Sequence, residues 1–123
     1  MNTTSINPKV TELFAAIDRM DAKGFAGFLA EDGRFWFGNQ PAVQGRRAVE
    51  EAVGGFFSSL GGLSHQLHRA FEQQGAMVVE GEVTYTRKDA RQVTLPFCNT
   101  FVMKGEGIAE YRIYADLAPL FAA

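Results

Sequence analysis

Residues 63–116 carry the clearest pattern in the chain, LSHQLHRAFEQQGAMVVEGEVTYTRKDARQVTLPFCNTFVMKGEGIAEYRIYAD. Apolar and polar residues alternate along four stretches, at 63–72, 76–87, 91–104 and 108–116, and the segments QQG, KDA and GEG separate them. Alternation with a period of two is typical of a strand with one buried face, and such short connections join antiparallel neighbours. This part of the sequence therefore predicts a meander of four long antiparallel strands.

Helical spacing replaces this alternation in the first half of the chain. Asn7 followed by Pro8 is typical of a helix N-cap and a first helical position, and Asp21 can cap a second helix. In chain order the predicted elements are a helix at 8–20, a short helix that ends at Asp32-Gly33, a strand at 34–37, a loop at 38–45 and a helix that ends at Gly61-Gly62.

The order of these elements, helices first and sheet afterwards, predicts an α+β fold. With 123 residues, of which 46% are hydrophobic and 21% charged, the chain has the composition of one globular domain, residues 1–123. Because long twisted sheets curl, helices against one face would enclose a cone-shaped interior in which a pocket can form. We therefore expect three N-terminal helices on a curved antiparallel sheet, made of the four meander strands and the short strand at 34–37.

Charge, cysteine content and apolar runs limit the partners and the cell compartment that we expect for the chain. The 12 basic and 14 acidic residues give a formal net charge of −2, which provides no positive surface for nucleic acid. The single cysteine, Cys98, cannot form a disulfide within the chain. The segment MNTTSINPKV shows no secretion signal, and no apolar run approaches the roughly 20 residues that cross a bilayer. These features predict a cytoplasmic protein with no nucleic-acid and no membrane partner.

Four segments are similar to one known family. They are FLAEDGRFWF (28–37), QGRRAVEEAVGGFF (44–57), LPFCNTFVMKGEG (95–107) and IAEYRIYADLAPLF (108–121). In this order, and over nearly the whole chain, they resemble the nuclear transport factor 2-like superfamily, in particular its SnoaL-like branch. The resemblance implies a cone-shaped sheet around a pocket, a homodimer and no cofactor. It does not fix an activity, because the superfamily includes ketosteroid isomerases, polyketide cyclases, limonene epoxide hydrolases, dehydratases and non-enzymatic binding proteins.

The resemblance also implies that familiar catalytic side chains of the family are absent here. The tyrosine and asparagine of the epoxide hydrolases fall at Phe35 and Phe37, and their last aspartate falls at Ile113. The base of the ketosteroid isomerases falls at Phe37, and the essential aspartate of the SnoaL-type cyclases falls at Ile113. The protonated aspartate of the isomerases falls at Asn99, whose amide is a permanent donor that could polarise a ligand carbonyl.

Asn99 and His65 are two of four candidate catalytic residues. Asn99 alternates with apolar residues and is predicted to face the pocket; the alternative is that its amide satisfies a neighbouring backbone group. His65 is a candidate base at the pocket mouth. Because His68 is three residues further along the same predicted strand, the two histidines point to opposite faces and cannot share a metal ion, and we expect no metal site.

Glu82 and Asp116 are the other two candidates, and each has two interpretations. Strict alternation turns Glu82, together with Glu80, towards solvent or a dimer interface, whereas the family resemblance extended without gaps turns both inward as acid or base. Alternation likewise turns Asp116 away from the pocket, to cap the C-terminal segment or pair with Arg112, whereas a bulge could turn it inward.

The predicted pocket wall is mainly aromatic, because the resemblance assigns several phenylalanines to it. Its residues are Phe14, Ile17, Phe28, Phe35, Phe37, Phe56, Leu60, Leu95, Phe97, Asn99, Tyr111 and Ile113. The expected ligand is a hydrophobic small molecule with one polar end. We therefore expect a small-molecule-binding protein, and one interpretation is a cofactor-independent isomerase or cyclase that acts on a carbonyl-containing hydrophobic compound. The alternatives are a non-catalytic ligand carrier or sensor and a pocket-less dimeric interaction module.

Overall fold

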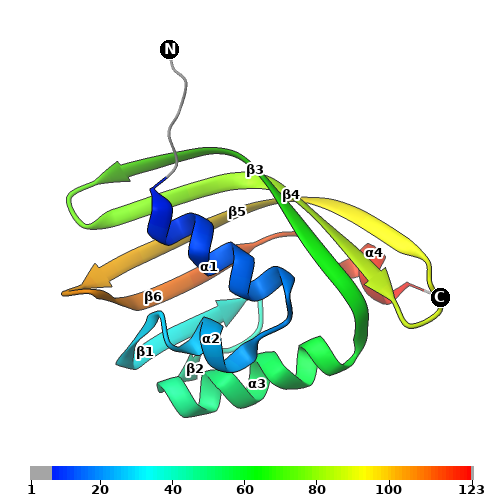
Figure 1. Ribbon diagram of the computed structural model, residues 1–123, viewed down its shortest axis with the longest axis horizontal. Helices are drawn as coiled ribbons and strands as arrows, with labels where there is room; N and C mark the ends of the chain where they lie inside the picture. Colours follow the sequence, from blue (N-terminus) through cyan, green and yellow to red (C-terminus); the bar gives the residue numbers. More distant parts are fainter. Residues whose placement is uncertain (1–6, 123) are drawn as a thin grey trace.

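A six-stranded curved sheet forms the frame of the structure, and helices lie against its concave side (Figure 1). The computed structural model describes residues 7–122. The strands are β1 (Leu29–Phe37), β2 (Val43–Gln44), β3 (Leu60–Gln73), β4 (Ala76–Arg87), β5 (Gln92–Lys104) and β6 (Gly107–Tyr114), in the spatial order β2-β1-β6-β5-β4-β3. The helices are α1 (Pro8–Asp18), α2 (Ala22–Ala26), α3 (Arg46–Ser58) and α4 (Ala118–Phe121). The predicted α+β fold with a curved sheet is confirmed.

The meander is as predicted, but the sheet is mixed. Each strand from β3 to β6 pairs antiparallel with the next one. β1 pairs parallel with β6, with Phe35 beside Tyr111, and the short β2 adds an antiparallel edge to β1. The expectation of a wholly antiparallel sheet was therefore wrong. Tight turns define the direction of neighbouring strands, whereas β1 and β6 are far apart in the chain and no turn joins them.

The second helix is shorter, and the first strand longer, than the sequence pattern predicts. α2 ends at Ala26, and Leu29 already belongs to β1. The backbone N–H of Ile108 donates to the carbonyl of Phe28 at 3.0 Å, which begins the pairing with β6. This tertiary pairing makes residues 29–33 extended, although their local spacing is compatible with a helix.

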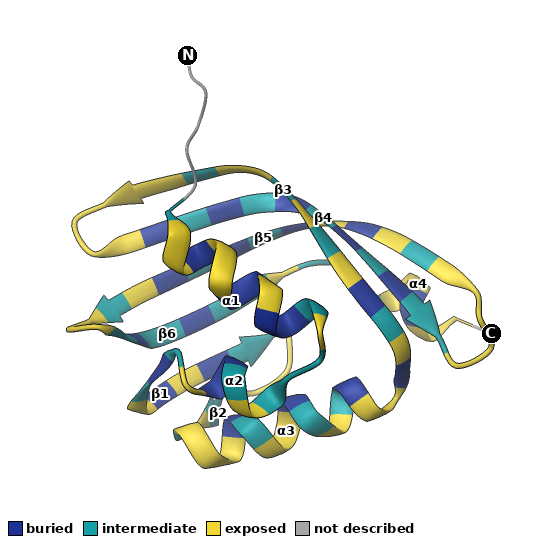
Figure 2. Cartoon of the chain, viewed as in Figure 1, coloured by how far each residue is buried: buried dark blue, intermediate teal, exposed yellow. Residues whose placement is uncertain are grey.

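The two predicted helix N-caps are confirmed. Asn7 Oδ1 accepts a hydrogen bond from the backbone N–H of Lys9 at 2.8 Å, and Pro8 is the first residue of α1. Asp21 Oδ1 accepts from the N–H of Gly24 at 2.9 Å at the start of α2. Figure 2 shows that the buried residues of α1 and α3 lie along one side of each helix. The cap at Asn7 therefore begins a helix, α1, whose apolar side packs on the sheet.

The C-terminal segment forms a short helix that the sequence pattern does not predict. Asp116 Oδ1 accepts a hydrogen bond from the N–H of Ala118 at 3.1 Å, just before the first turn of α4. The guanidinium of Arg87, at the end of β4, donates to the carbonyls of Leu120 and Ala122. These contacts hold α4 beside the end of β4.

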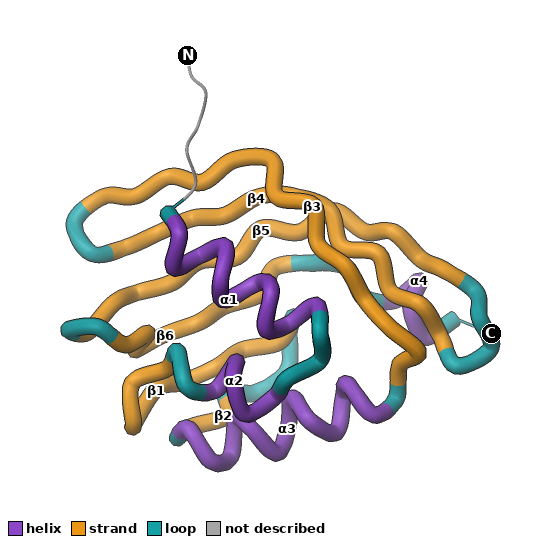
Figure 3. Tube along the Cα trace, in the orientation of Figure 1, coloured by secondary structure: helices purple, strands orange, loops and turns teal. Residues whose placement is uncertain are grey.

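β3 and β4 bend together (Figure 3), and Gly81 of β4 lies against the backbone of β3. The pairing register shifts between Leu67 and Arg69, which marks a β-bulge. A Cβ at position 81 would overlap the carbonyl oxygen of Gln66 and lie 3.1 Å from the Cα of Leu67. The close approach of the two backbones therefore requires glycine.

The chain's single tryptophan lies on the outer face of the junction between β1 and β6. The Arg112 guanidinium lies 3.7 Å from the centre of the Trp36 ring, and that of Arg34 lies 5.0 Å from it. Arg112 is also the partner of Trp36 in the parallel register. Two cation–π contacts thus reinforce the parallel pairing from outside.

Within the described residues, no helix is long and apolar enough to cross a membrane. α3 has 13 residues, against the roughly 20 that a membrane span needs. Residues 1–6, on which the expectation of no secretion signal partly depends, lie outside the described residues.

We expect Gly81→Ala to lower the free energy of unfolding by about 2 kcal/mol, because an added methyl group must push the β3 and β4 backbones apart. Urea unfolding measures this change. Gly55→Ala is the matched control, since a Cβ at this exposed position of α3 meets nothing within 4 Å and alanine favours a helix. A Gly81→Ala protein as stable as the wild type would show that the close approach is not needed.

Candidate functional site

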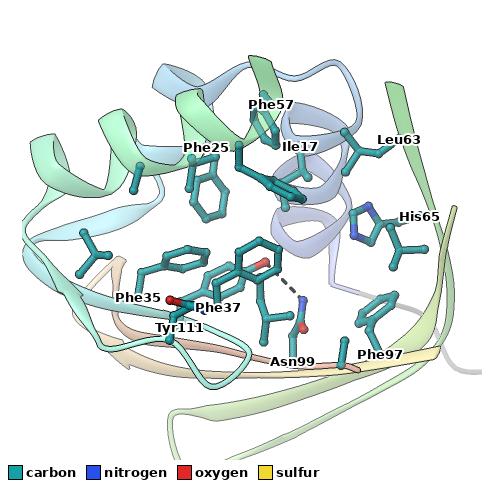
Figure 4. Close-up of a pocket in the computed structure, with 18 of the residues that line it drawn as sticks. Ile17, Phe25, Phe35, Phe37, Phe57, Leu63, His65, Phe97, Asn99 and Tyr111 are labelled. Carbon is teal, nitrogen blue, oxygen red and sulfur yellow. Dashed lines mark hydrogen bonds between the residues drawn. The ribbon is translucent and has the colours of Figure 1, made fainter. Parts of the chain in front are cut away.

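A cavity of about 430 Å³ lies between the concave face of the sheet and the helices (Figure 4). Eight aromatic side chains border it: Phe25, Phe35, Phe37, Phe56, Phe57, Phe97, Tyr85 and Tyr111. Several of these rings meet edge to face, such as Phe37 and Phe56 with their centres 4.7 Å apart. The rings therefore surround an open volume of a size that holds a small organic molecule.

Eight of the twelve residues predicted to line a pocket border this cavity. They are Ile17, Phe35, Phe37, Phe56, Phe97, Asn99, Tyr111 and Ile113. The prediction was wrong for the other four, because Phe14, Leu60 and Leu95 are buried in the hydrophobic core without bordering the cavity, and Phe28 packs against that core from the turn after α2. Spacing along an element identifies the inward face, but it does not tell which inward residues lie beside an empty volume.

Other lining residues were missed at the sequence level. The loop residues Gln40, Pro41 and Ala42 contribute to the cavity wall together with Val43 of β2, and no periodic pattern could place this loop there. Val83 and Tyr85 of β4 also line the cavity. They alternate with the more exposed Glu82 and Thr84, and this alternation is a signal that could have identified them.

The most distinctive polar feature of the cavity is a contact between His65 and Asp18. His65 Nδ1 lies 2.6 Å from Asp18 Oδ1, and the backbone N–H of His65 donates to Asp18 Oδ2 at 3.0 Å. Asp18 is the last residue of α1, and His65 is in the first half of β3. The carboxylate therefore holds the histidine through two bonds. No sequence pattern identifies Asp18 as a partner of His65, because 47 positions separate the two residues.

The same contact orients the imidazole towards the cavity. The His65 ring meets the rings of Phe14 and Phe97 edge to face, with centres 4.9 Å and 5.2 Å away, and its side chain is only 8% exposed. A carboxylate at Nδ1 fixes the proton on that nitrogen and leaves Nε2 as the free lone pair. No residue from 7 to 122 forms a hydrogen bond with Nε2, and His65 borders the cavity. This arrangement can accept a proton from a bound molecule.

Asn99 and Tyr111 form a second polar pair in the wall. Asn99 Nδ2 donates to the Tyr111 hydroxyl oxygen at 3.5 Å, and both side chains are buried (Figure 4). Burial raises the pKa of Tyr111 well above its ordinary value, and the hydrogen bond from Asn99 opposes that rise. Burial also raises the pKa of Tyr85 to about 12. Both phenols are therefore neutral hydrogen-bond donors at pH 7.

Glu82 and Asp116, two of the candidate catalytic residues, lie outside the cavity. Glu82 lies on the outer face of β4, where its carboxylate is 3.7 Å from His68 and 46% exposed. Its neighbour on the same face, Glu80, pairs with Arg69. The interpretation that turned Glu82 inward was wrong, because Val83 and Tyr85 occupy the inward positions of this strand.

Asp116 is exposed, beyond the end of β6, and its carboxylate accepts a hydrogen bond from the N–H of Ala118. It therefore cannot act in the cavity. Across residues 7–122, no three side chains of His, Cys, Asp or Glu come together in a way that could hold a metal ion.

The chain matches a known family. Residues 10–111 match the SnoaL-like domain, and the chain belongs to this family. No curated protein gives a significant match. Solved structures with low sequence identity share the fold of this chain.

Three solved structures illustrate this similarity. A protein with a ketosteroid isomerase-like fold from Catenulispora acidiphila DSM 44928, in complex with trimethylamine, has a TM-score of 0.85 at 17% identity, over 94% of this chain and 89% of that one. A putative polyketide cyclase from Xanthomonas campestris pv. campestris has a TM-score of 0.76 at 21% identity, over 90% of each chain. An LEH-like epoxide hydrolase from M. tuberculosis has a TM-score of 0.78 at 18% identity, over 93% of this chain and 84% of that one.

The raised pKa of Tyr85 predicts a loss of stability in alkaline solution. A phenol whose pKa is about 12 in the folded state and about 10 in the unfolded state stabilises the fold below pH 10, and this contribution is lost as the pH rises towards 12. Between pH 8 and pH 11, the free energy of unfolding should fall by about 1 kcal/mol less in Tyr85→Phe than in the wild type. Urea unfolding at the two pH values measures this. Tyr114→Phe, at an exposed position, is the matched control, and identical pH dependence in all three proteins would contradict the prediction.

Proposed function

We propose that the protein is a cofactor-independent acid–base enzyme that acts on a hydrophobic, carbonyl-containing small molecule. The observation that carries this proposal is the 2.6 Å contact between Asp18 and His65 in the wall of an aromatic cavity. A histidine held at Nδ1 by a carboxylate is a general base whose other nitrogen is free. An aromatic cavity in turn favours a ligand with a large apolar surface.

The reaction class follows from the groups available. His65 Nε2 takes a proton from a carbon next to the substrate carbonyl, and Asp18 stabilises the imidazolium that forms. The electron pair of the broken C–H bond moves to the carbonyl oxygen, and a neutral phenol, Tyr85 or Tyr111, donates a hydrogen bond to the resulting enolate. Return of the proton to the same carbon exchanges it, and return to another carbon isomerises the compound. Atoms and electrons balance without a cofactor.

The position of this base accounts for the hydrophobic residues that replace the familiar family bases. Phe37 on β1 and Ile113 on β6 stand where the resemblance implies carboxylates, and both line the cavity. A base on β3 would act from a different wall of the same cavity. The similar structures described as having a ketosteroid isomerase-like fold and as a putative polyketide cyclase support chemistry at a carbon next to a carbonyl.

A non-catalytic ligand carrier is the second candidate. It is favoured by the composition of the wall, in which aromatic and aliphatic side chains outnumber the polar ones. A carrier would hold a hydrophobic compound through its apolar surface and would not use the Asp18–His65 contact for chemistry.

Proton exchange separates the two candidates. We expect the wild-type protein to accelerate exchange of the α-protons of 2-tetralone with D2O, followed by NMR. Removal of a general base costs on the order of 100-fold or more in rate. His65→Asn and Asp18→Asn should therefore each lose most of the acceleration.

The matched control is His68→Asn, which makes the same change on the outer face of β3, where the imidazole contacts Glu82. It should exchange 2-tetralone as the wild type does. Binding of 2-tetralone with no acceleration by any of these proteins would refute the enzyme and favour the carrier. Equal acceleration by His65→Asn and the wild type would refute His65 as the base.

A further inference from the structure

Two tyrosines border the cavity, and they differ in whether their hydroxyl groups are free to meet a ligand. Tyr111 is fully buried, and its hydroxyl oxygen accepts the hydrogen bond from Asn99 (Figure 4). Tyr85 is 4% exposed, and its hydroxyl forms no hydrogen bond within residues 7–122. Among the described residues, Asn99 Oδ1 is the one unpartnered side-chain nitrogen or oxygen that the protein encloses completely. The unpartnered hydroxyl of Tyr85 is therefore open.

The open hydroxyl of Tyr85 belongs to the inner side of the sheet. Tyr85 and Val83 are in the inward-facing row of β4, and both border the cavity. The Tyr85 ring packs edge to face against Phe56 of α3, with the ring centres 5.8 Å apart. Burial raises the pKa of Tyr111, and the charge of Tyr85 raises it further, an effect that weakens with distance. These contacts direct the phenol of Tyr85 into the volume that Tyr111 also borders.

Tyr85 is a diagonal neighbour of His65 on the adjacent strand. In the antiparallel register, Leu63 of β3 lies opposite Tyr85, and His65 lies opposite Val83. The pairing is regular between Gly62 and Leu67, so the backbones of His65 and Tyr85 are about 7–8 Å apart. One wall of the cavity thus carries two unpartnered polar groups, the imidazole Nε2 and the phenol O–H.

A base and a neutral donor on one wall suit a ketone. The carbon that carries the acidic proton of a ketone is two bonds away from the carbonyl oxygen. A ketone that accepts a hydrogen bond from Tyr85 can therefore present this carbon to His65 Nε2. Among the described residues that border the cavity, none is Lys or Arg, so the wall offers a neutral donor to the oxygen on which negative charge develops.

We propose that Tyr85 is the catalytic hydrogen-bond donor of the cavity, and that it binds the carbonyl oxygen of the substrate so that the adjacent carbon lies at His65. This inference rests on the proposed function, in which either of two phenols can donate. Tyr85 gives up no proton: it donates a hydrogen bond while His65 takes the proton from carbon and the electron pair moves to the carbonyl oxygen. Burial raises the pKa of Tyr85 to about 12, which keeps the phenol neutral.

Two compounds test the contact by calorimetric titration of the full chain. 2-Tetralone has the carbonyl group, and tetralin has the same two rings without it. We expect Tyr85→Phe to bind 2-tetralone about tenfold more weakly than the wild type does, and to bind tetralin unchanged, because only the ketone loses a hydrogen bond. Tyr85→Phe should also slow the exchange of the α-protons of 2-tetralone by on the order of 100-fold.

Two further variants make the same chemical change elsewhere. The Tyr111 hydroxyl is enclosed and bonded to Asn99, so Tyr111→Phe should alter the binding of 2-tetralone and of tetralin to the same extent. Tyr114 is exposed and does not border the cavity, so Tyr114→Phe should bind both compounds as the wild type does. A loss specific to 2-tetralone in Tyr111→Phe and not in Tyr85→Phe would overturn the inference, since Tyr111 would then be the donor.

The infrared carbonyl band of bound 2-tetralone tests the contact in the wild type itself. With the carbonyl isotope-labelled, the band of the bound ketone should lie at a lower wavenumber than in cyclohexane, because a hydrogen bond weakens the C=O bond. In Tyr85→Phe it should return towards the cyclohexane position. A band at the cyclohexane position in the wild type would overturn the inference, even if Tyr85→Phe does not fold. Equal effects of Tyr85→Phe on 2-tetralone and tetralin, including no binding of either, would overturn it as well.

The same measurements separate this contact from the proposed reaction. His65→Asn should keep the lowered carbonyl band, because Tyr85 binds the ketone without the base. Binding of 2-tetralone that depends on Tyr85, without α-proton exchange, would refute only the acid–base reaction. Exchange that requires His65 but not Tyr85 would refute only the contact with Tyr85.

Discussion

Backbone contact between Gly81 and Gln66 sets the shape of the sheet that faces the helices. Without a side chain at Gly81, β3 and β4 approach closely enough to bend together beside the bulge after Leu67. The bend gives the sheet a concave face, and α1 and α3 cover that face without filling it. It also brings β3 against the end of α1, where Asp18 meets His65.

The polar groups of the cavity differ in how well the protein itself satisfies them. His65 is held by a carboxylate through its ring and its backbone, and Tyr111 receives a bond from Asn99. Asn99 Oδ1 remains without a partner. In a wall made mostly of aromatic rings, such an atom is unfavourable for stability, and proteins concentrate such unfavourable groups where they bind or transform molecules. The contrast between the hydrogen-bonded groups and the unpartnered oxygen therefore bears on the function of the cavity.

Much of the fold was predictable because its signals are local. Alternation defined the meander, the side chains of Asn7 and Asp21 marked helix starts, and alternation around Asn99 located its inward face. The parallel pairing of β1 with β6 was not predictable, because it joins segments that are distant in the chain. Asp18 was missed for the same reason: on the sequence it is an ordinary polar residue at a helix end, and its role arises from a contact 47 positions away. Glu82 shows that alternation within the strand was a better guide than a gapless extension of a family resemblance.

The contacts of Trp36 with two arginines have a practical consequence for following how the molecule folds. The ring lies on the outer face, where Arg112 of β6 covers it when β1 is docked, while the neighbouring Phe35 and Phe37 point into the cavity. Since the chain has no other tryptophan, indole fluorescence reports on the docking of the first strand onto the last. The change of this fluorescence with time therefore follows the pairing of the N-terminal half with the meander. Because Trp36 lies outside the cavity, this change is distinct from one caused by a ligand in the cavity.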